Sequence, residues 1–534
     1  MICKYISHTG RLASLIARRD RIRIPVWIAA IALLSLMIAP AFTELYPTQQ
    51  DRMIMAETMK NPAMIAMVGP LYGSDNYSTG AMFANEMLLF TAVAVAIMSI
   101  FIVIRHTRKD EEGGRIEVIR SLPVGRLSNL SAAIAVSFAA NILLALLVGF
   151  GLYSLGIESM GLEGSLLYGA ALGAAGFVFT AIAALFSQLA ESSRGAVGYS
   201  FTFLIAAYLI RAVGDVSSEP LAWFSPLGWI LRARVYVSNL WWPILITLFA
   251  AIAISALALY LNARRDLGAG FIPAKPGRKY ASAFLQTPFG LAVRLQTTGI
   301  IAWAIGMYLL GASYGSVLGD LDTFFESNEM ISKILPAAEG FTLTELFVTT
   351  LMSIISMACA IPALLFVSKL RSEEKRNRTE HVLARSVSRT RLLAGYLSIS
   401  LLSSFIMQLL AIVGLWSAGA AVMEDPIPFG RMFRAGIVYL PALWAMTGLA
   451  VLLLGLLPKA LSFIWLYLGF SFFVVYLGGI LQVPEWLVKC SPFGNIPKVP
   501  VEELNLTKLA VLTVIAAVLT LLGIYGYRRR DIFN

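Results

Sequence analysis

The segment that decides the fold is residues 108–126, which reads RKDEEGGRIEVIRSLPVGR and directly follows a long apolar run. A related string, RSEEKRNRTEHVLARSVSR, occupies residues 371–389, 263 positions later, and it also follows an apolar run. Acidic, basic and apolar residues recur at matching positions in the two strings. Because a repeat of this kind changes every later fold assignment, we infer first that the chain contains a duplicated unit.

Two further pairs of segments support the duplication. Residues 225–228 (SPLG) match residues 491–494 (SPFG), and residues 264–267 (RRDL) match residues 529–532 (RRDI). These pairs keep nearly the same offset and the same order along the chain as the first pair. The repeating unit is therefore about half of the chain.

The composition is that of a membrane protein. Hydrophobic residues make up 58% of the chain and charged residues 14%, whereas soluble domains contain about 25% charged residues. Three scattered cysteines are too few for a disulfide framework or a metal site. The net charge of +11 gathers in the connections between apolar segments, which indicates membrane topology and no nucleic-acid partner.

Crossing the hydrocarbon core of a membrane takes roughly 20 mainly apolar residues, and twelve segments meet this condition. In the first half they are 24–44, 82–104, 129–154, 165–187, 195–213 and 240–261. In the second half they are 297–318, 345–368, 394–422, 433–457, 459–481 and 508–527. We therefore predict an all-α polytopic membrane protein with 12 transmembrane helices in two parallel six-helix repeats, covering residues 1–270 and 271–534.

The distribution of Lys and Arg predicts the orientation. Basic residues are frequent before the first span, after the second, sixth and eighth spans, and in the tail, and they are scarce in the alternate connections. The positive-inside rule then places both termini in the cytoplasm. Because six helices return the chain to its starting side, the repeat axis lies along the membrane normal, with a central pathway expected between the halves.

Two charged amphipathic segments, 105–128 and 368–391, are the candidate functional sites. Basic residues alone satisfy the positive-inside rule, so that rule does not explain the repeated carboxylates. Acidic and basic groups at fixed spacing can set the register of a docked partner, although a solvated loop remains the alternative. The candidate docking residues are Arg108, Asp110, Glu111, Arg115, Glu117 and Arg120 in the first segment and Arg371, Glu373, Glu374, Arg378 and Glu380 in the second.

The N-terminal segment, residues 4–23, is predicted to be a cationic helix at the membrane surface. Its apolar residues Leu12, Leu15, Ile16 and Ile22 fall on one face, and most of its arginines fall on the other. Such helices lie in the interface and bind anionic lipid. Anchoring to lipid and transmission of motion to the first span are both compatible with this pattern.

Few polar residues lie inside the predicted spans. Asn141 and Gln408 are deep within theirs, whereas Glu86 and Glu345 lie near the outer ends of the second and eighth spans. Embedded polar residues often mark a transport pathway, so these four are pathway candidates, with structural roles as the alternative. Around residues 223–229 and 486–494, aromatic and helix-breaking residues predict either re-entrant outer segments or an aromatic interface belt.

The sequence has no recognisable catalytic motif. A G-x-x-x-x-G-K-[ST] phosphate loop is absent, and the three histidines form no metal-binding pattern. We therefore expect a protein that is not an enzyme and that has no catalytic, cofactor-binding or metal-binding residues. Any ATP and Mg²⁺ would have to be bound by a partner.

The string RHTRKDEEGGR at residues 105–115, followed by Glu117, resembles a known class of transporter. Together with the two six-helix halves, it is similar to permeases of ABC-2 type ATP-binding-cassette exporters. The resemblance is to the fused twelve-helix branch that exports polyketide antibiotics, like the tetronasin-resistance membrane component. It implies a permease that exports a hydrophobic or amphipathic compound, an antibiotic, drug or lipid-like molecule, with energy from two copies of a separately encoded ABC ATPase.

By this resemblance, the segments 105–128 and 368–391 would dock on the ATPase subunits. The copies differ, because Gly113-Gly114 in the first is Arg376-Asn377 in the second, so the two docking surfaces are expected to be unequal. Two other readings stay open: a twelve-helix secondary drug carrier and a non-transporting membrane sensor subunit. The first is disfavoured because the second-to-third connection, about 24 residues long, lacks the compact G-x-x-x-D-R/K-x-G-R/K motif of such carriers.

Overall fold

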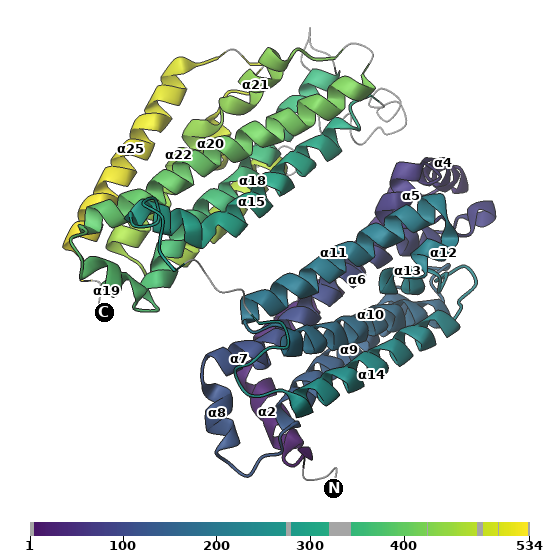
Figure 1. Ribbon diagram of the computed structural model, residues 1–534. Coiled ribbons are helices and arrows are strands. Elements are labelled where there is room, and N and C mark those ends of the chain that lie inside the picture. Colours follow the sequence, from purple (N-terminus) through teal and green to yellow (C-terminus); the bar gives the residue numbers. More distant parts are fainter. Residues whose placement is uncertain are drawn as a thin grey trace. The chain divides into compact units, whose positions relative to one another are not determined.

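The computed structural model describes residues 5–273, 279–319, 343–423, 426–477, 484–499, 501–502 and 504–531 (Figure 1). Over these ranges the chain is helical without named strands, and a single isolated bridge joins Ala190 to Ile272. The predicted all-α class is therefore confirmed for this part of the chain. Residue 4 of the predicted N-terminal helix and residues 478–481 of the predicted eleventh span lie outside it.

The chain divides into two compact units, Met1–Gly277 and Arg278–Asn534. Six helices of the first unit are long and apolar enough to cross a membrane. They are α3 (Arg23–Leu45), α6 (Thr79–His106), α9 (Ser128–Ser154), α10 (Leu162–Leu189), α11 (Ser193–Ser217) and α14 (Trp242–Arg264). These helices coincide with the six spans predicted for the first half.

The second unit has five helical segments that meet the same condition in the described ranges. They are α15 (Pro288–Gly315), α18 (Leu343–Glu374), α20 (Arg389–Val422), the pair α21 (Phe429–Ile437) and α22 (Leu440–Leu456), and α25 (Leu506–Arg529). The predicted tenth span is thus two helices in sequence. Pro441 lies in the first turn of α22, where its missing N–H is tolerated and its ring prevents a continuous helix.

The predicted eleventh span, 459–481, differs from the structure. A short apolar helix covers Ala460–Tyr476, comprising η2 (Ala460–Ser462), α23 (Phe463–Phe472) and the π-helical turn η3 (Phe473–Leu477). At 1.5 Å per residue it is about 25 Å long, less than the roughly 30 Å of a hydrocarbon core. The described residues therefore contain eleven candidate spans, and the twelfth stays a prediction.

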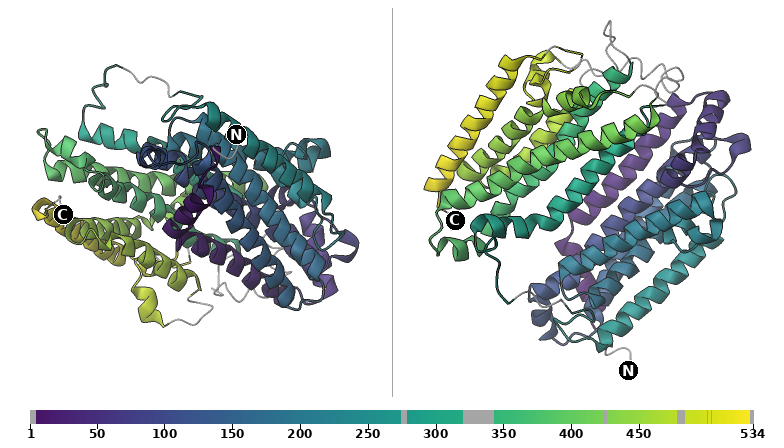
Figure 2. Two further views of the ribbon diagram at one scale, coloured as in Figure 1. Left: turned by 90° about the horizontal axis from the view of Figure 1, so that it is seen from below. Right: turned by 45° about the horizontal axis from the view of Figure 1, so that its top comes forward.

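The helices of each unit pack in a corresponding order. In the first unit α10 packs against α6, α9 and α14, and α3 packs against α9; in the second, α22 packs against α18, α20 and α25, and α15 packs against α20. Figures 1 and 2 show the long helices of each unit lying side by side. The sequence repeat is therefore matched by a repeated pattern of helix contacts.

Shorter helices lie between the spans. In the first unit α4 (Gln49–Met59), α5 (Pro62–Val68) and η1 (Ser74–Asn76) follow α3, and α12 (Glu219–Ala222) and α13 (Pro226–Leu231) follow α11. In the second unit α24 (Glu485–Lys489) and η4 (Phe493–Asn495) precede α25. Helix α13 is largely buried and contacts α6, α10, α11 and α14, in keeping with a segment that re-enters the helix bundle. The Trp223 ring stacks on Trp242 with centroids 5.3 Å apart.

Small residues let α9 and α10 approach closely. A Cβ on Gly169 of α10 would lie 2.2 Å from the carbonyl oxygen of Ala145 in α9. Interfaces between membrane helices commonly depend on such residues, because they bring the backbones together. The close contact therefore depends on glycine at position 169.

We expect Gly169→Ala to destabilise the first unit by about 1–3 kcal/mol, the usual cost of overpacking a close-packed site. The matched control is Gly198→Ala in α11, because a Cβ there has no heavy atom within 4 Å. Thermal unfolding of the purified protein in detergent measures the stability of both variants. An equal unfolding midpoint for the two variants would contradict this packing.

Candidate functional site

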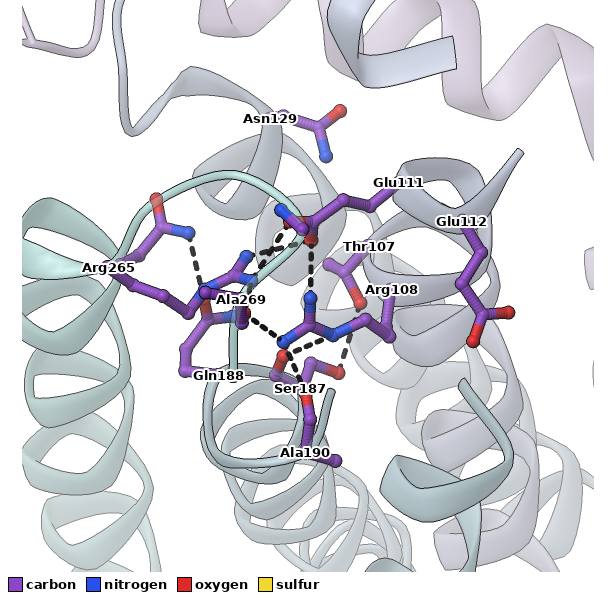
Figure 3. Close-up of polar contacts among 12 residues, drawn as sticks. Thr107, Arg108, Glu111, Glu112, Asn129, Ser187, Gln188, Ala190, Arg265 and Ala269 are labelled. Carbon is purple, nitrogen blue, oxygen red and sulfur yellow. Dashed lines mark hydrogen bonds and ion pairs between the residues drawn. The ribbon is translucent and has the colours of Figure 1, made fainter. Parts of the chain in front are cut away.

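The first predicted docking segment forms two short helices, α7 (Arg108–Glu112) and α8 (Arg115–Arg120), directly after α6. They lie where several helices of the first unit end (Figure 3). The Asn129 side chain at the start of α9 donates to the carbonyl of His106 at the end of α6, at 2.9 Å. Polar contacts at this end also reach α10, α11 and the segment after α14.

Arg108 is the centre of one set of contacts. Its side chain is 1% exposed, and its Nε donates to the Ser187 carbonyl at 3.2 Å. Its Nη2 donates to the carbonyls of Ala190 and Ala269, the latter at 2.8 Å. Arg108 therefore joins α7 to the end of α10 and to the chain that leaves α14 (Figure 3).

Glu111 forms the second set. Its two carboxylate oxygens accept from Nη1 and Nη2 of Arg265 at 2.9 and 2.8 Å, and the backbone N–H of Gly268 donates to it at 2.7 Å. Arg108 Nη1 lies 3.2 Å from the same carboxylate. Gln188 accepts from Arg265 Nε at 3.1 Å. A bidentate pair of this kind fixes both distance and orientation, so α7 is held firmly against the end of α14.

Asp110 connects α7 to the N-terminal helix α2 (Thr9–Arg19). Its carboxylate accepts two bonds from Arg19, at 2.5 and 2.7 Å, and one from Arg115, at 2.9 Å. The neighbouring Asp20 pairs with Arg105 at 3.1 Å and with His106 at 2.7 Å. The start of α3 and the end of α14 thus lie at the same end of the unit.

The second unit repeats these pairs. Glu374 pairs with Arg371 at 3.1 Å and with Arg530 at 2.6 Å, as Glu111 pairs with Arg108 and Arg265. Glu373, near the end of α18, pairs with Lys369 of the same helix at 3.0 Å. It also pairs at 3.4 Å with Arg378, the first residue of α19 (Arg378–Leu383).

One further backbone contact recurs. Arg126 donates to the Arg265 carbonyl at 2.9 Å, and Arg389 donates to the Arg530 carbonyl at 2.7 Å. We call the four pairs Arg108–Glu111, Glu111–Arg265, Arg371–Glu374 and Glu374–Arg530 the juxtamembrane latches.

Comparison with known proteins identifies the family. The family described as "Multidrug efflux system permease Rv1217c, C-terminal domain" matches residues 11–261 and 285–528. The chain belongs to this family. It is similar to the multidrug efflux system permease protein Rv1217c of Mycobacterium tuberculosis, with 36% identity over 527 residues, covering 98% of this chain and 94% of the relative.

Membership of a permease family, together with the eleven apolar helices, identifies a multi-pass membrane protein of a transport system. It indicates a transporter and not an enzyme. In the described ranges, no group of three or more His, Cys, Asp or Glu side chains could hold a metal ion. The matched ranges fall one in each unit and leave out residues 262–284, which contain Arg265.

The latches change the interpretation of several predicted docking residues. Arg108, Asp110, Glu373 and Glu374 are buried, and the Glu111 side chain is 8% exposed. Their partners belong to the same unit, so the repeated carboxylates are explained without a docked protein. The positive-inside rule is thus not the only alternative to docking, and the docking role of these residues stays a prediction.

The other predicted docking residues are placed differently. Arg115, Glu117, Arg378 and Glu380 are exposed, whereas Arg120 and Arg371 are partly buried. The exposed group remains available to a partner. Its docking role stays a prediction.

The N-terminal helix is shorter than predicted and only half of its apolar face is buried. Leu12 and Ile16 pack in a cluster with Ala132 and Ala133 of α9. In contrast, Leu15 is 52% and Ile22 is 69% exposed. The helix packs on its own unit through Leu12 and Ile16, whereas Ile22 lies beyond α2 at the start of α3. The role of this segment at the membrane surface stays a prediction.

Two pathway candidates have hydrogen-bond partners within their own units. Asn141 is fully buried and donates to Ser99 of α6 at 3.0 Å. Gln408 is fully buried and donates to Ser356 of α18 at 2.8 Å. Both amides join the second and third spans of a unit, which favours the structural alternative.

The two carboxylate candidates lie in the N-terminal parts of their helices. Glu345 at the start of α18 pairs with Arg431 of α21 at 3.3 Å, and Glu86 in α6 is partly buried. Their roles in a pathway stay predictions. Sequence reasoning also missed a buried cluster in which Asp215 lies 3.5 Å from Arg211 and 3.3 Å from Arg232.

We expect the Glu111–Arg265 pair to show strong coupling in a double-mutant cycle. Glu111→Gln alone should cost about 3–5 kcal/mol, because it leaves the buried Arg265 and Arg108 without a carboxylate. Arg265→Gln alone should cost less, because Glu111 keeps its contact with Arg108 at 3.2 Å. The double variant should cost clearly less than the sum of the single variants. Thermal unfolding of the purified protein measures all three.

The exposed Glu117→Gln is the control for loss of a carboxylate and should change stability by less than about 0.5 kcal/mol. The cycle of Glu374→Gln and Arg530→Gln tests the second unit in the same way. If the losses of stability from the single substitutions add up in both cycles, the two residues of each pair do not stabilise the protein through their mutual contact.

Proposed function

We propose that this chain is the membrane-spanning subunit of an ABC-2 type exporter that moves a hydrophobic or amphipathic compound out of the cell. Two copies of a separately encoded ABC ATPase would supply the energy. The proposal includes twelve spans in two parallel six-helix repeats, with a central pathway between the halves. Both termini would be cytoplasmic and the chain would lie in the bacterial plasma membrane.

Full-length similarity to a multidrug efflux permease is the observation that carries this proposal. The whole sequence has no phosphate-loop motif, so a transporter driven by ATP requires another subunit. The repeat of charged segments after the second span of each unit provides two corresponding places for that subunit. A secondary carrier would require neither feature.

The latches suggest how motion of an ATPase would reach the spans. Glu111 contacts both Arg108 in its own helix and Arg265 at the end of α14, so a force on α7 and α8 is transmitted directly to the sixth span. Glu374 connects α18 to α25 in the same way. Closure of the ATPases would then tilt each half and open the pathway outward. Apolar cargo would bind mainly by burial, at about 25 cal/mol per Å².

The docking surface that we propose consists of the exposed residues of each segment. In residues 105–128 three basic and two acidic side chains are exposed, whereas in 368–391 five basic side chains and one acidic side chain are exposed. Val118 and Leu122 are 68% and 58% exposed. The residues 263 positions later are His381 and Arg385, which are also exposed. The first surface is therefore more apolar and the second more basic.

We expect ATP to drive transport only when the ATPase is present. The tagged protein should co-purify with a protein that contains a phosphate-loop sequence. Proteoliposomes that contain both should transport a fluorescent amphipathic drug on addition of ATP, and proteoliposomes with the permease alone should not. Efflux by the permease alone under a proton gradient would instead establish a secondary carrier.

Exchange of residues between the two surfaces tests the docking assignment. Leu122→Arg should make ATPase binding more sensitive to salt, and Arg385→Leu should make it less sensitive, because exposed charge pairs are screened. Each change should alter affinity at low salt by about twofold to fivefold.

The control is Lys60→Leu, which removes an exposed cation in the connection between α3 and α6. Biolayer interferometry over a series of salt concentrations measures the affinity of each variant for the ATPase. Identical salt dependence in all three variants would exclude these surfaces as the contact.

A further inference from the structure

An apolar groove lies along the first unit where α2 and α3 meet α9. Its volume is about 410 Å³, within the range of roughly 300–1,000 Å³ that is usual for small-molecule sites. Ile28 and Ala29 of α3 form one wall, and Ala139, Ala140 and Leu143 of α9 form the other. Ala29, Ala139 and Leu143 are exposed, so the groove opens at the surface of two apolar candidate spans.

One end of the groove is basic. Arg21 lines it, and Arg18 and Arg23 lie within three residues of Arg21; all three are exposed. Within the described ranges, the side chains of these three arginines form no hydrogen bond or ion pair with the protein. Arg19, by contrast, is paired with Asp110.

The one carboxylate in the groove is already neutralised. Asp20 lines the same end, but it pairs with Arg105 at 3.1 Å and with His106 at 2.7 Å, and it is 3% exposed. Arg21 at the basic end, together with Arg18 and Arg23 next to it along the chain, therefore has no acidic partner in the described residues. This end can bind an anion next to the apolar part of the groove.

We propose that this groove binds one anionic phospholipid, with an acyl chain between α3 and α9 and the phosphate over Arg18, Arg21 and Arg23. An acyl chain matches the apolar walls, which belong to helices that cross the membrane. Basic clusters beside membrane helices recognise anionic headgroups. The proposal does not depend on the ATPase or on the cargo.

The second unit gives a reason to expect one such lipid per chain. Its first span, α15, begins at Pro288, and the described residues 279–287 that precede it form turns and irregular structure without a helix like α2. The junction of two helices that frames the groove therefore belongs to the first unit. The bound lipid would stabilise the position of α2, which also holds Asp110 through Arg19.

Native mass spectrometry of the full-length protein tests this proposal. The protein is reconstituted in phosphatidylcholine vesicles that contain a minor fraction of phosphatidylglycerol and is then extracted in detergent. We expect one phosphatidylglycerol to be retained per chain, in preference to phosphatidylcholine. Arg21→Gln should weaken retention by roughly fivefold, since each basic residue near an anionic headgroup contributes about a fivefold change in affinity.

Two groove-filling variants, Ala29→Trp and Ala139→Trp, should abolish retention, and they alter opposite walls in case one of them fails to fold. The controls are Arg11→Gln, an exposed arginine of α2 that does not line the groove, and Ala253→Trp, an exposed alanine of α14.

Equal retention of the two lipids would overturn the proposal, as would retention in both folded tryptophan variants. Displacement of the phosphatidylglycerol by a transported drug would also overturn it, because the groove would then be a cargo site.

Discussion

A buried carboxylate–guanidinium pair at the end of each unit determines the arrangement of the elements around it. Glu111 with Arg265 and Glu374 with Arg530 lie at 2.8 and 2.6 Å, with all four side chains largely removed from solvent. Charges in such a place are costly unless they are paired with good geometry. The second-to-third connection therefore has to remain against the end of the sixth span, and the helices between them pack around that contact.

The pair also explains why the sequence repeats where it does. Two matches that look independent in the sequence, the strings at 108–126 and 371–389 and the RRD strings at 264–266 and 529–531, meet in space in each unit. The first contributes the carboxylate and the second contributes the arginine. A requirement for complementary charge would keep both segments similar in the two halves, while the residues that face outward, such as Val118 and His381, have diverged.

Much of the fold followed from apolar length, because the cost of leaving backbone groups unpaired in lipid makes long apolar segments helical. Eleven of the twelve predicted spans correspond to helices for this reason. The break before Pro441 and the short helix at 460–476 did not follow, since hydropathy does not report where a helix turns. The burial of Arg108, Asp110, Glu373 and Glu374 in the predicted site also did not follow from the sequence. The role of Glu111 depends on Arg265, which is distant in sequence, and the sequence signal for the pair was that both residues recur in the second half at nearly the same offset.

The separation of the two partners along the chain has a consequence for biosynthesis. Glu111 and Arg265 are 154 residues apart, and Glu374 and Arg530 are 156 apart. During translation the carboxylate emerges four spans before the arginine that will neutralise it. Each half can therefore complete its polar contacts only when its last helix has left the ribosome and entered the membrane. Until then the carboxylate has only the arginine three residues before it, Arg108 or Arg371, as its partner.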